Sequence, residues 1–384
     1  MANKLEDIRQ QLDNIDHTII KALADRQKVV QDVFNLKIDG DSRIRDLERE
    51  EKILQRIGNI ARKTGLDRSY VEQLYREIIN HSVRYQTQSL VDHQNETSAS
   101  KTISVAYQGT EGAFSHRAAL KHFKERYAQV HCYGYDGFRD AARSVEKGET
   151  DVAILPIENT TAGSINATYD VLGDGSLHII GEEVLRIVHC LMAVEQVDLP
   201  NIRRIISHPQ ALSQCSRYLS RLPRCKVESY TDTAMAAKKV LEDADLSQAA
   251  IASAYAAEIY GLHILERDIA NQEQNFTRFV VVGREPVHVD EQIVCKTSLM
   301  MTTTHTEGDL INCLRVLGDH SINMTKIESR PRPNEPWKYL FYVDVEGNMD
   351  DPDFKSAIEK MRKRADSLNI LGCYPEQVSA SYTK

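Results

Sequence analysis

Residues 5–36 read LEDIRQQLDNIDHTIIKALADRQKVVQDVFNL, and this stretch decides the fold of the first part of the chain. Its apolar residues recur at alternating spacings of three and four, the pattern of a heptad seam along one long helix. At 1.5 Å per residue such a helix is roughly 50 Å long. A monomeric bundle of this size covers so long a seam poorly, so the sequence predicts a dimer. The seam residues are Leu5, Ile8, Leu12, Ile15, Ile19, Ala22, Val29, Val33 and Leu36.

Two shorter helices are expected to complete the first domain. The second runs from about Ile44 to Ala61 and is broken by Gly65. Asp67 has the side chain of a helix N-cap, so a third helix is expected from there to about Gln86. Residues 1–90 therefore predict an all-α helical domain.

The composition of the chain changes at a polar stretch, 89–101, and this stretch predicts a linker. Residues 102–285 alternate apolar β-branched runs with helical stretches, and this alternation indicates an α/β domain. Residues 297–384 form a smaller alternating unit. The 384-residue chain is thus expected to hold three domains.

Composition excludes several classes of protein. A net charge of −8 gives no basic face for nucleic acid, and an anionic substrate would need locally placed Arg and Lys. No apolar run approaches the ~20 residues that span a bilayer, and the N-terminus lacks a signal-peptide core. A cytoplasmic location is the expectation. Seven widely spaced cysteines without a Cys-x-x-Cys pair favour neither a zinc site nor disulfides.

Arg26 interrupts the apolar seam. An uncompensated charge on a packed seam is costly. The residue is therefore either half of a structural ion pair, with Asp46, Glu48 or Glu50, or part of an anion site. Both alternatives are open on the sequence.

Other polar residues favour a site. Lys37 follows Arg26 by three helical turns and shares its face. Arg9 precedes Arg26 by roughly 25 Å along the axis, so it can serve the same site only from a partner subunit. Ser82 and Gln86 continue the apolar stripe of the third helix, and Asp46, Arg49 and Glu50 share one face of the second.

The helical segment resembles the all-α chorismate mutases that head bifunctional enzymes. The resemblance implies a pericyclic rearrangement of chorismate to prephenate, which needs no metal, cofactor or nucleophile. Arg9 and Arg26 would bind the two carboxylates, helped by Arg49, because guanidinium groups bind carboxylates bidentately. Lys37 and Gln86 would donate to the ether oxygen. The full set that matches the family pattern is Arg9, Arg26, Lys37, Asp46, Arg49, Glu50, Ser82 and Gln86.

The middle zone places polar or Gly-containing loops around its predicted strands. These loops occupy 108–116, 156–164, 207–212 and 275–279. Open α/β sheets bind ligands at the carboxyl ends of parallel strands, and a loop that enters a helix exposes N–H groups to anions. Each loop alone also fits simple turn chemistry. The predicted strands are Ile103–Tyr107, Asp151–Leu155 and Ile202–Ile206.

Together these loops resemble prephenate dehydratase, whose hallmark Thr-Arg-Phe triplet is Thr277, Arg278 and Phe279. The resemblance implies two α/β lobes, similar to bacterial solute-binding proteins, with the active cleft between them. It also implies that the strand after Thr277 returns to the first lobe. The reaction would remove water and carbon dioxide from prephenate, giving phenylpyruvate.

The resemblance also implies roles in the cleft. Thr277 would donate to the leaving hydroxyl, by positioning or by relaying a proton from Glu158, His116 or water. Arg278 would either anchor a carboxylate or form a lobe-bridging salt bridge. The cleft would be lined by Ser115, Asn159 and Thr160.

The last zone predicts the order βαββαβ, which is a ferredoxin-like unit. It resembles the ACT-type amino-acid sensor, with phenylalanine as the implied effector. The expected elements are strands Thr297–Thr303, Met324–Ser329, Tyr339–Val345 and Asn369–Cys373, and helices Gly308–His320 and Pro352–Leu368.

Two motifs carry this last resemblance. Glu328, Ser329 and Arg330 begin the Glu-Ser-Arg-Pro run of the effector site. Gly308 and Leu310 fit the second motif, while Asp309 adds a charge where that family has Ala. An interface-only domain is the alternative.

Two rival hypotheses remain for the whole chain. One is a non-enzymatic sensor, in which two solute-binding lobes and an amino-acid sensor are joined to a helical dimerisation module. The other is an enzyme with a decayed mutase domain. The polar set of the helical zone and Thr277 favour the bifunctional enzyme over both.

Overall fold

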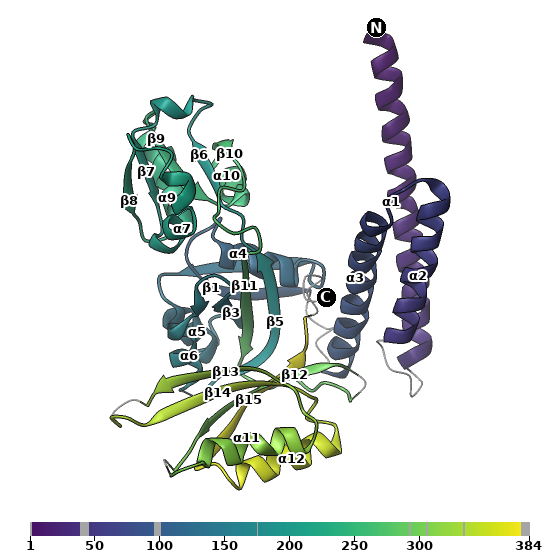
Figure 1. The fold of residues 1–384 in the computed structure, drawn as a ribbon, viewed down its shortest axis with the longest axis vertical. Helices are drawn as coiled ribbons and strands as arrows, with labels where there is room; N and C mark the ends of the chain where they lie inside the picture. The colour runs from purple at the N-terminus through teal and green to yellow at the C-terminus, as the bar shows by residue number, and fades with distance from the viewer. Residues whose placement is uncertain are drawn as a thin grey trace. The chain divides into compact units, whose positions relative to one another are not determined.

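The computed structural model describes residues 2–38, 46–95, 101–174, 176–291, 293–304, 306–332 and 335–377, without the side chains of 2–4, 34, 36–38, 47 and 92–94. The described chain forms two compact units. One unit contains three helices, and the other contains three β-sheets with their helices (Figure 1).

The helical unit confirms the predicted long helix. α1 runs from Ala2 to Ile38, α2 from Leu47 to Thr64 and α3 from Arg68 to Gln94. Gly65 ends α2 with a left-handed φ of 77°, a conformation that glycine adopts without steric strain because it has no Cβ. Asp67 caps α3 by accepting a hydrogen bond from the Tyr70 N–H.

Three predicted boundaries in this unit differ from the structure, the first being the end of α2, which lies at Thr64 rather than at Ala61. α2 begins at Leu47 rather than at Ile44, because the Asp46 carboxylate accepts from the Arg49 N–H at 2.9 Å and caps the helix. α3 continues for two turns past Gln86, into the segment expected to be linker. Leu90 and Val91 are buried there, so apolar packing extends the helix.

The second unit begins with a mixed sheet, here called the first lobe. Its strand order is β2-β1-β3-β11-β5, with β4 paired to β3. β1 pairs in parallel with β2 and β3, while β11 pairs antiparallel with both β3 and β5. Its elements are β1 Thr102–Gln108, α4 Phe114–Phe123, β2 Gln129–Tyr135, α5 Phe138–Glu146, β3 Val152–Asn159, β4 Gly163–Ser164, α6 Asn166–Leu172, β5 His178–Arg186 and β11 Phe276–Gly283.

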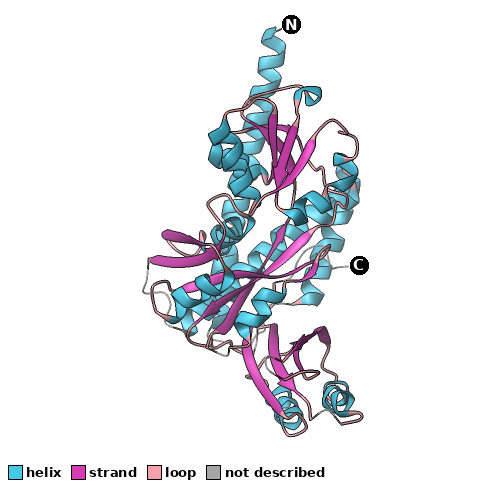
Figure 2. Cartoon of the chain, turned by 90° about the vertical axis from the view of Figure 1, so that its left-hand side faces the viewer, coloured by secondary structure: helices cyan, strands magenta, loops and turns pink. Residues whose placement is uncertain are grey.

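The intervening chain forms a second lobe with strand order β10-β6-β9-β7-β8. The chain enters it after β5 and leaves it before β11, so β11 returns to the first lobe as expected. Figure 2 shows strands and helices in both lobes. The elements are β6 Cys190–Ala193, η2 Leu199–Asn201, β7 Arg204–Ser207, α7 Pro209–Gln214, α8 Ser216–Leu219, β8 Lys226–Ser229, α9 Thr233–Asp243, β9 Gln248–Ala252, α10 Ala254–Tyr260 and β10 His263–Glu266.

The C-terminal sheet confirms the predicted βαββαβ order. Its strands are arranged β13-β14-β12-β15. One predicted helix is too long, because α12 ends at Arg362 and the next strand already begins at Ser367. The elements are β12 Cys295–Thr302, α11 Asp309–Asp319, β13 Met324–Pro331, β14 Tyr339–Glu346, α12 Pro352–Arg362 and β15 Ser367–Pro375.

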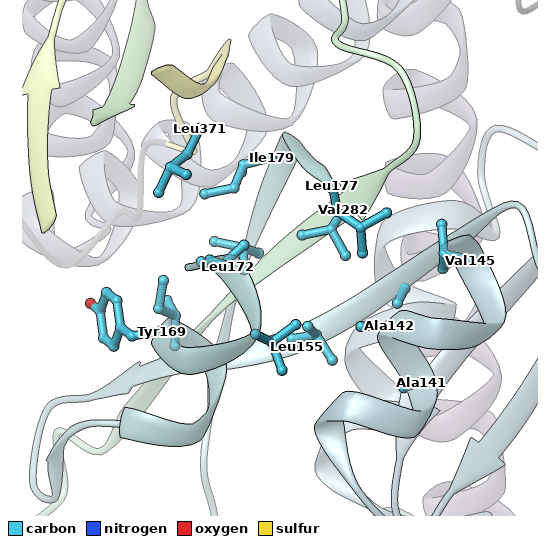
Figure 3. Packing of buried hydrophobic residues seen from close by; sticks show 14 of the residues in the cluster. Ala141, Ala142, Val145, Leu155, Tyr169, Leu172, Leu177, Ile179, Val282 and Leu371 are labelled. Carbon is cyan, nitrogen blue, oxygen red and sulfur yellow. The ribbon is translucent and has the colours of Figure 1, made fainter. Parts of the chain in front are cut away.

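The C-terminal sheet shares a core with the first lobe. One of its faces packs on α11 and α12, and residues of its other face join a buried cluster of the first lobe. Figure 3 shows Leu371 of β15 near Ile179 of β5 within this cluster. The approach is close enough that a Cβ at Gly372 would lie 2.0 Å from the Ile179 carbonyl oxygen.

Candidate active sites

A cavity of about 460 Å³ lies among residues of both lobes. Its size is within the range that holds a small molecule. Predicted site residues Ser115, Asn159 and Thr277 all line it. The other lining residues are Gln108, Ala113, Phe114, Phe138, Pro156, Ala162, Ser164, Ile165, Ile187, His189, His208, Gln210, Ala211, Gln214, Thr231, Asp232, Thr233 and Phe279.

Strand pairing places two of the predicted residues together. Thr277 of β11 is directly opposite Asn159 of β3 in the antiparallel register. The Asn159 Nδ2 donates to the Thr277 Oγ1 at 3.0 Å, and both side chains are less than a tenth exposed. Thr277 is therefore an acceptor toward Asn159, which leaves its own O–H proton free for another partner.

Asn159 holds the loop that follows β3. Its Oδ1 accepts from the backbone N–H groups of Thr161 at 3.0 Å and Ala162 at 2.8 Å. Its Nδ2 also donates to the Asn275 Oδ1 at 2.8 Å. Because a backbone N–H can only donate, the two loop contacts fix which end of the Asn159 amide is oxygen.

The paired neighbours of these two residues, Glu158 before Asn159 and Arg278 after Thr277, point away from the cavity, since side chains alternate across a sheet. Glu158 forms an ion pair with Lys326 at 3.0 Å, and Arg278 bonds Glu182 at 2.7 Å and Asp344 at 2.6 Å. Neither Glu158 nor Arg278 is among the residues that line the cavity, so the proton relay from Glu158 and the carboxylate anchor at Arg278 stay predictions without a contact here. The ion pair of Arg278 with Asp344 joins the first lobe to the C-terminal sheet, whereas the alternative expected a salt bridge between the two lobes.

Two further predicted residues lie outside the lining. The His116 Nδ1 accepts from the Gly112 N–H at 3.2 Å, and its ring stacks on Tyr107. Burial lowers the pKa of His116. Thr160 is exposed, and its hydroxyl accepts from the Phe276 N–H at 2.9 Å. Both side chains serve local structure here.

Several polar residues of the cavity had no predicted role, and among them Asp232 and His189 lie in segments that carried no motif. Burial raises the pKa of Asp232, against the hydrogen bonds that its carboxylate accepts at the start of α9. His208 lies within a predicted loop and caps α7. Gln214 lies just beyond that loop and bonds His189.

The cavity offers little cationic side-chain charge. The described residues that line it include neither Lys nor Arg, contrary to the expectation from overall charge. Helix α4 instead begins at the cavity, with Phe114 and Ser115 in its first turn. The N–H groups of a helix N-terminus favour anionic groups.

In the helical unit, α1 and α3 bring three predicted residues together. The Arg26 guanidinium donates to the Ser82 Oγ at 2.6 Å. Arg26 is therefore bonded to another residue of the predicted mutase site. One turn further along α3, the Gln86 Nε2 donates to the Val30 carbonyl at 3.1 Å. Gln86 is 7% exposed, so it is no frayed surface residue.

Other members of the predicted mutase set are not assembled around Arg26. Arg9 is exposed and lies 3.8 Å from Glu6 on its own helix. Asp46 serves as the cap of α2, where Arg49 is exposed and Glu50 is half-buried. The side chain of Lys37 lies outside the described residues.

The residues of the predicted effector site belong to two places in the C-terminal sheet unit. Gly308 caps α11 with a φ of 82°, and Leu310 follows in the first turn. The Asp309 carboxylate accepts from the Thr304 hydroxyl and the Thr306 N–H, and these bonds lower its pKa. The charge that departs from the family pattern is thus bonded to the loop that leads into the helix.

Strand β13 bonds to the first lobe. The Ser164 hydroxyl donates to Glu328 at 2.5 Å, and Arg330 forms an ion pair with Asp170 at 2.9 Å. Ser329 lies between them in the strand, opposite Phe341. Two of the three predicted motif residues therefore contact the first lobe.

Comparison with known proteins agrees with this division. The family model for chorismate mutase type II matches residues 8–87, and the model for prephenate dehydratase matches residues 105–287. No helix among the described residues is long and apolar enough to cross a membrane.

The bifunctional chorismate mutase/prephenate dehydratase of Escherichia coli K12 is 36% identical over 375 residues, covering 98% of this chain and 97% of that protein. A prephenate dehydratase from Arthrobacter aurescens, solved with L-Phe, has a TM-score of 0.65 and 28% identity, covering 72% of this chain and 90% of that one. GqqA, described as a novel type of quorum-quenching acylase, has a TM-score of 0.64 and 30% identity, covering 71% and 97%.

The full-length relatives decide between the hypotheses drawn from the sequence. The non-enzymatic sensor disagrees with a match to bifunctional enzymes that covers 98% of this chain, and a decayed mutase domain disagrees with the match of residues 8–87 to the chorismate mutase family model. The chain belongs to the family of bifunctional chorismate mutase/prephenate dehydratases, enzymes of phenylalanine biosynthesis.

Proposed function

We propose that prephenate is dehydrated in the cavity between the lobes, with the Thr277 hydroxyl as hydrogen-bond donor to the leaving hydroxyl. The observation that carries this proposal is the bond from Asn159 Nδ2 to Thr277 Oγ1 at 3.0 Å. Since that bond occupies a lone pair of the oxygen, the O–H proton of Thr277 is free for the substrate.

The reaction breaks two bonds of prephenate. The ring carboxylate leaves as carbon dioxide, and the electrons of its C–C bond enter the ring as the C–O bond to the ring hydroxyl breaks. The departing oxygen takes up one proton and leaves as water. A Thr hydroxyl is a weak acid, so Thr277 works by positioning and by relay from water rather than as the proton's source.

The substrate carboxylate that remains needs an anchor. The first turn of α4, with Ser115 in the lining, is the part of the cavity whose N–H groups suit an anion. This assignment replaces Arg278 as the anchor.

For the mutase reaction, we assign the carboxylates of chorismate to Arg26 and to Arg9 of a second copy of the chain. Arg26 is held by Ser82, and Gln86 keeps one amide hydrogen for the ether oxygen after bonding Val30. Lys37 would be the second donor. Arg49, Asp46 and Glu50 would orient the substrate hydroxyl and the basic groups.

The two-copy arrangement is supported by the exposed seam of α1. Ile8, Leu12, Ile15 and Ile19 are each about half exposed within one chain. A continuous apolar stripe on a soluble helix is typical of a helix that packs against a partner. A homodimer, or a higher homo-oligomer, buries it, and the cytoplasm is the proposed location.

Feedback inhibition by phenylalanine is proposed for the C-terminal sheet as an ACT-type domain. The support is the L-Phe complex of the Arthrobacter relative and the motif residues Glu328 to Arg330. An effector that draws Glu328 or Arg330 away from Ser164 and Asp170 would act directly on the first lobe. A domain that serves only as an interface would bind no phenylalanine.

Turnover of chorismate tests both site assignments in one preparation. Prephenate and phenylpyruvate are followed in the wild type, Lys37→Ala and Thr277→Val, with Thr277→Ser as the variant that keeps the hydroxyl. Lys37→Ala is expected to block prephenate formation while still dehydrating added prephenate. Thr277→Val is expected to accumulate prephenate, and Thr277→Ser to retain turnover. Full dehydration by Thr277→Val would remove Thr277 from the mechanism.

A further inference from the structure

His189 lies where the chain crosses from the first lobe to the second, between β5 and β6. It lines the cavity and is 2% exposed. Its ring meets Phe114 edge-on, with centroids 5.7 Å apart and planes at 83°. His189 thus lies in the wall of the proposed dehydratase site, and the proposed reaction does not use it.

A chain of polar contacts joins His189 to the residues around Thr277. The His189 Nε2 lies 2.8 Å from the Gln214 Oε1. The Gln214 Nε2 donates to the Thr161 Oγ1 at 2.5 Å and faces the Asn159 Oδ1 at 3.3 Å. Asn159 in turn donates to Thr277.

The orientation of the Asn159 amide determines which group donates in each of the hydrogen bonds that link Asn159 to His189. The Asn159 Oδ1 must be the acceptor, because the backbone N–H groups of Thr161 and Ala162 donate to it. Gln214 therefore presents its NH₂ group to Asn159 and its oxygen to His189. An amide oxygen only accepts, so the proton on the His189 ring is on Nε2.

The other ring nitrogen settles the charge of His189. Its Nδ1 is buried and has no hydrogen-bond partner among the described residues. A proton there would give a charged ring a buried N–H with no acceptor among the described residues, which is costly. Burial lowers the pKa of His189 despite the hydrogen bond with Gln214. His189 is therefore a neutral imidazole of a single tautomer.

We propose that His189 is a positioning residue of the dehydratase reaction, which fixes the amide of Gln214 by donating from Nε2. Through Gln214 it holds Asn159 in the orientation that leaves the Thr277 O–H for the substrate. The inference rests on the proposed donor role of Thr277. It assigns His189 no contact with the reacting atoms.

A buried histidine can also be mere packing, and the two roles differ in what they require. Packing requires a ring-sized side chain. Positioning requires an N–H donor at the Nε2 position, which a glutamine amide can supply and a leucine cannot. The comparison of His189→Gln with His189→Leu separates the two.

The test measures kcat and KM for prephenate in the full chain, with mutase activity and thermal unfolding as checks on the same preparations. His189→Leu is expected to lower kcat by about tenfold or more, with KM changed much less, because loss of the donor misorients the group acting in the transition state. His189→Gln is expected to retain most of the kcat. Equal losses in the two variants, or a full kcat in His189→Leu, would overturn the proposal.

A second variant tests the direction of the hydrogen bonds between His189, Gln214 and Asn159. Gln214→Glu still accepts from His189 but cannot donate to Asn159 or Thr161, so its kcat is expected to fall as in His189→Leu. The double variant His189→Leu/Gln214→Leu is expected to lose no more than the worse single variant, since both act through one chain. Multiplicative losses contradict the proposal.

Thr277→Val separates this inference from the proposed function. If Thr277→Val is inactive while His189→Leu is fully active, only the role of His189 fails. If Thr277→Val is fully active, the donor role of Thr277 fails first, and positioning through it fails as well.

Discussion

Arg278 of the first lobe and Asp344 of the C-terminal sheet form a hydrogen-bonded ion pair, with guanidinium and carboxylate 2.6 Å apart. Burial alone would lower the pKa of Arg278, but the charge of Asp344 holds it well above its ordinary value. Lys296 adds an ion pair at 3.0 Å to Glu182, a second carboxylate that pairs with Arg278. Strand β11, which carries Thr277, is therefore joined to the C-terminal sheet through Arg278, the residue after Thr277.

The first prediction concerns this pair. Asp344→Ala removes one of the carboxylates that pair with the buried charge of Arg278, and is expected to cost about 3 kcal/mol. Ser298→Ala removes hydrogen bonds to Asp344 and Tyr374 but leaves the ion pair in place, and is expected to cost about 1–2 kcal/mol. Calorimetric unfolding of the two variants compares them, and equal melting temperatures would contradict the ion pair's importance.

The second prediction concerns acid stability. Burial would raise the pKa of Glu183, but the hydrogen bond from His122 and the charge of Lys121 lower it from 4.5 to about 2. A carboxyl whose pKa is depressed by folding stabilises the fold above its unfolded pKa and loses this as pH falls through the folded pKa. The contribution is on the order of 3 kcal/mol at neutral pH.

Glu183→Gln should therefore melt below the wild type at pH 7. The difference in melting temperature should shrink between pH 4.5 and pH 2, where the wild-type carboxyl is protonated. A difference that stays constant over this range would show that the lowered pKa is not its cause.

The third prediction uses the contact between β15 and β5. Gly372→Ala would place a Cβ 2.0 Å from the Ile179 carbonyl oxygen, so the C-terminal sheet must shift. The expected loss is about 1–3 kcal/mol. Gly318→Ala is the control, because its Cβ meets nothing within 4 Å and alanine favours the helix. Thermal unfolding should move in opposite directions in the two variants.

The fourth prediction addresses the mutase site. Arg26→Lys keeps a charge but loses the planar fork that binds a carboxylate bidentately, so kcat/KM for chorismate is expected to fall by about a hundredfold. Ser82→Ala should cost several-fold, because it only orients Arg26. Ser89→Ala, whose hydroxyl bonds its own helix, should change nothing. Dehydration of added prephenate should be normal in all three.

The fifth prediction tests the second copy of the chain. Ile15→Glu puts a charge on the exposed seam of α1 and is expected to dissociate the helical domains and abolish mutase activity. Gln10→Glu adds the same charge at a residue outside the seam and should leave both unchanged. Light scattering and chorismate turnover provide the measurements. Unaltered mass and mutase activity in Ile15→Glu would argue against a shared site.

Local chemistry allowed much of this architecture to be predicted. The seam of α1, the left-handed Gly65 and the Asp67 cap each follow from spacing or from one residue's conformational preference. The βαββαβ order follows from alternating periods in the same way. Two boundaries that differed depended on other factors, since Asp46 caps α2 instead of joining it, and α3 continues past Gln86 where Leu90 and Val91 are buried.

The sequence by itself determined which elements form and which polar residues could carry chemistry, because periodicity and capping act over a few neighbouring residues. Only the tertiary structure decided which of those residues meet. The antiparallel register of β11 on β3 brings Thr277 to Asn159 and, by alternation, turns Arg278 and Glu158 toward the C-terminal sheet. His189 lines the cavity because it lies where the chain passes from the first lobe to the second. That position depends on how the two lobes pack, so no local pattern in the sequence predicts it.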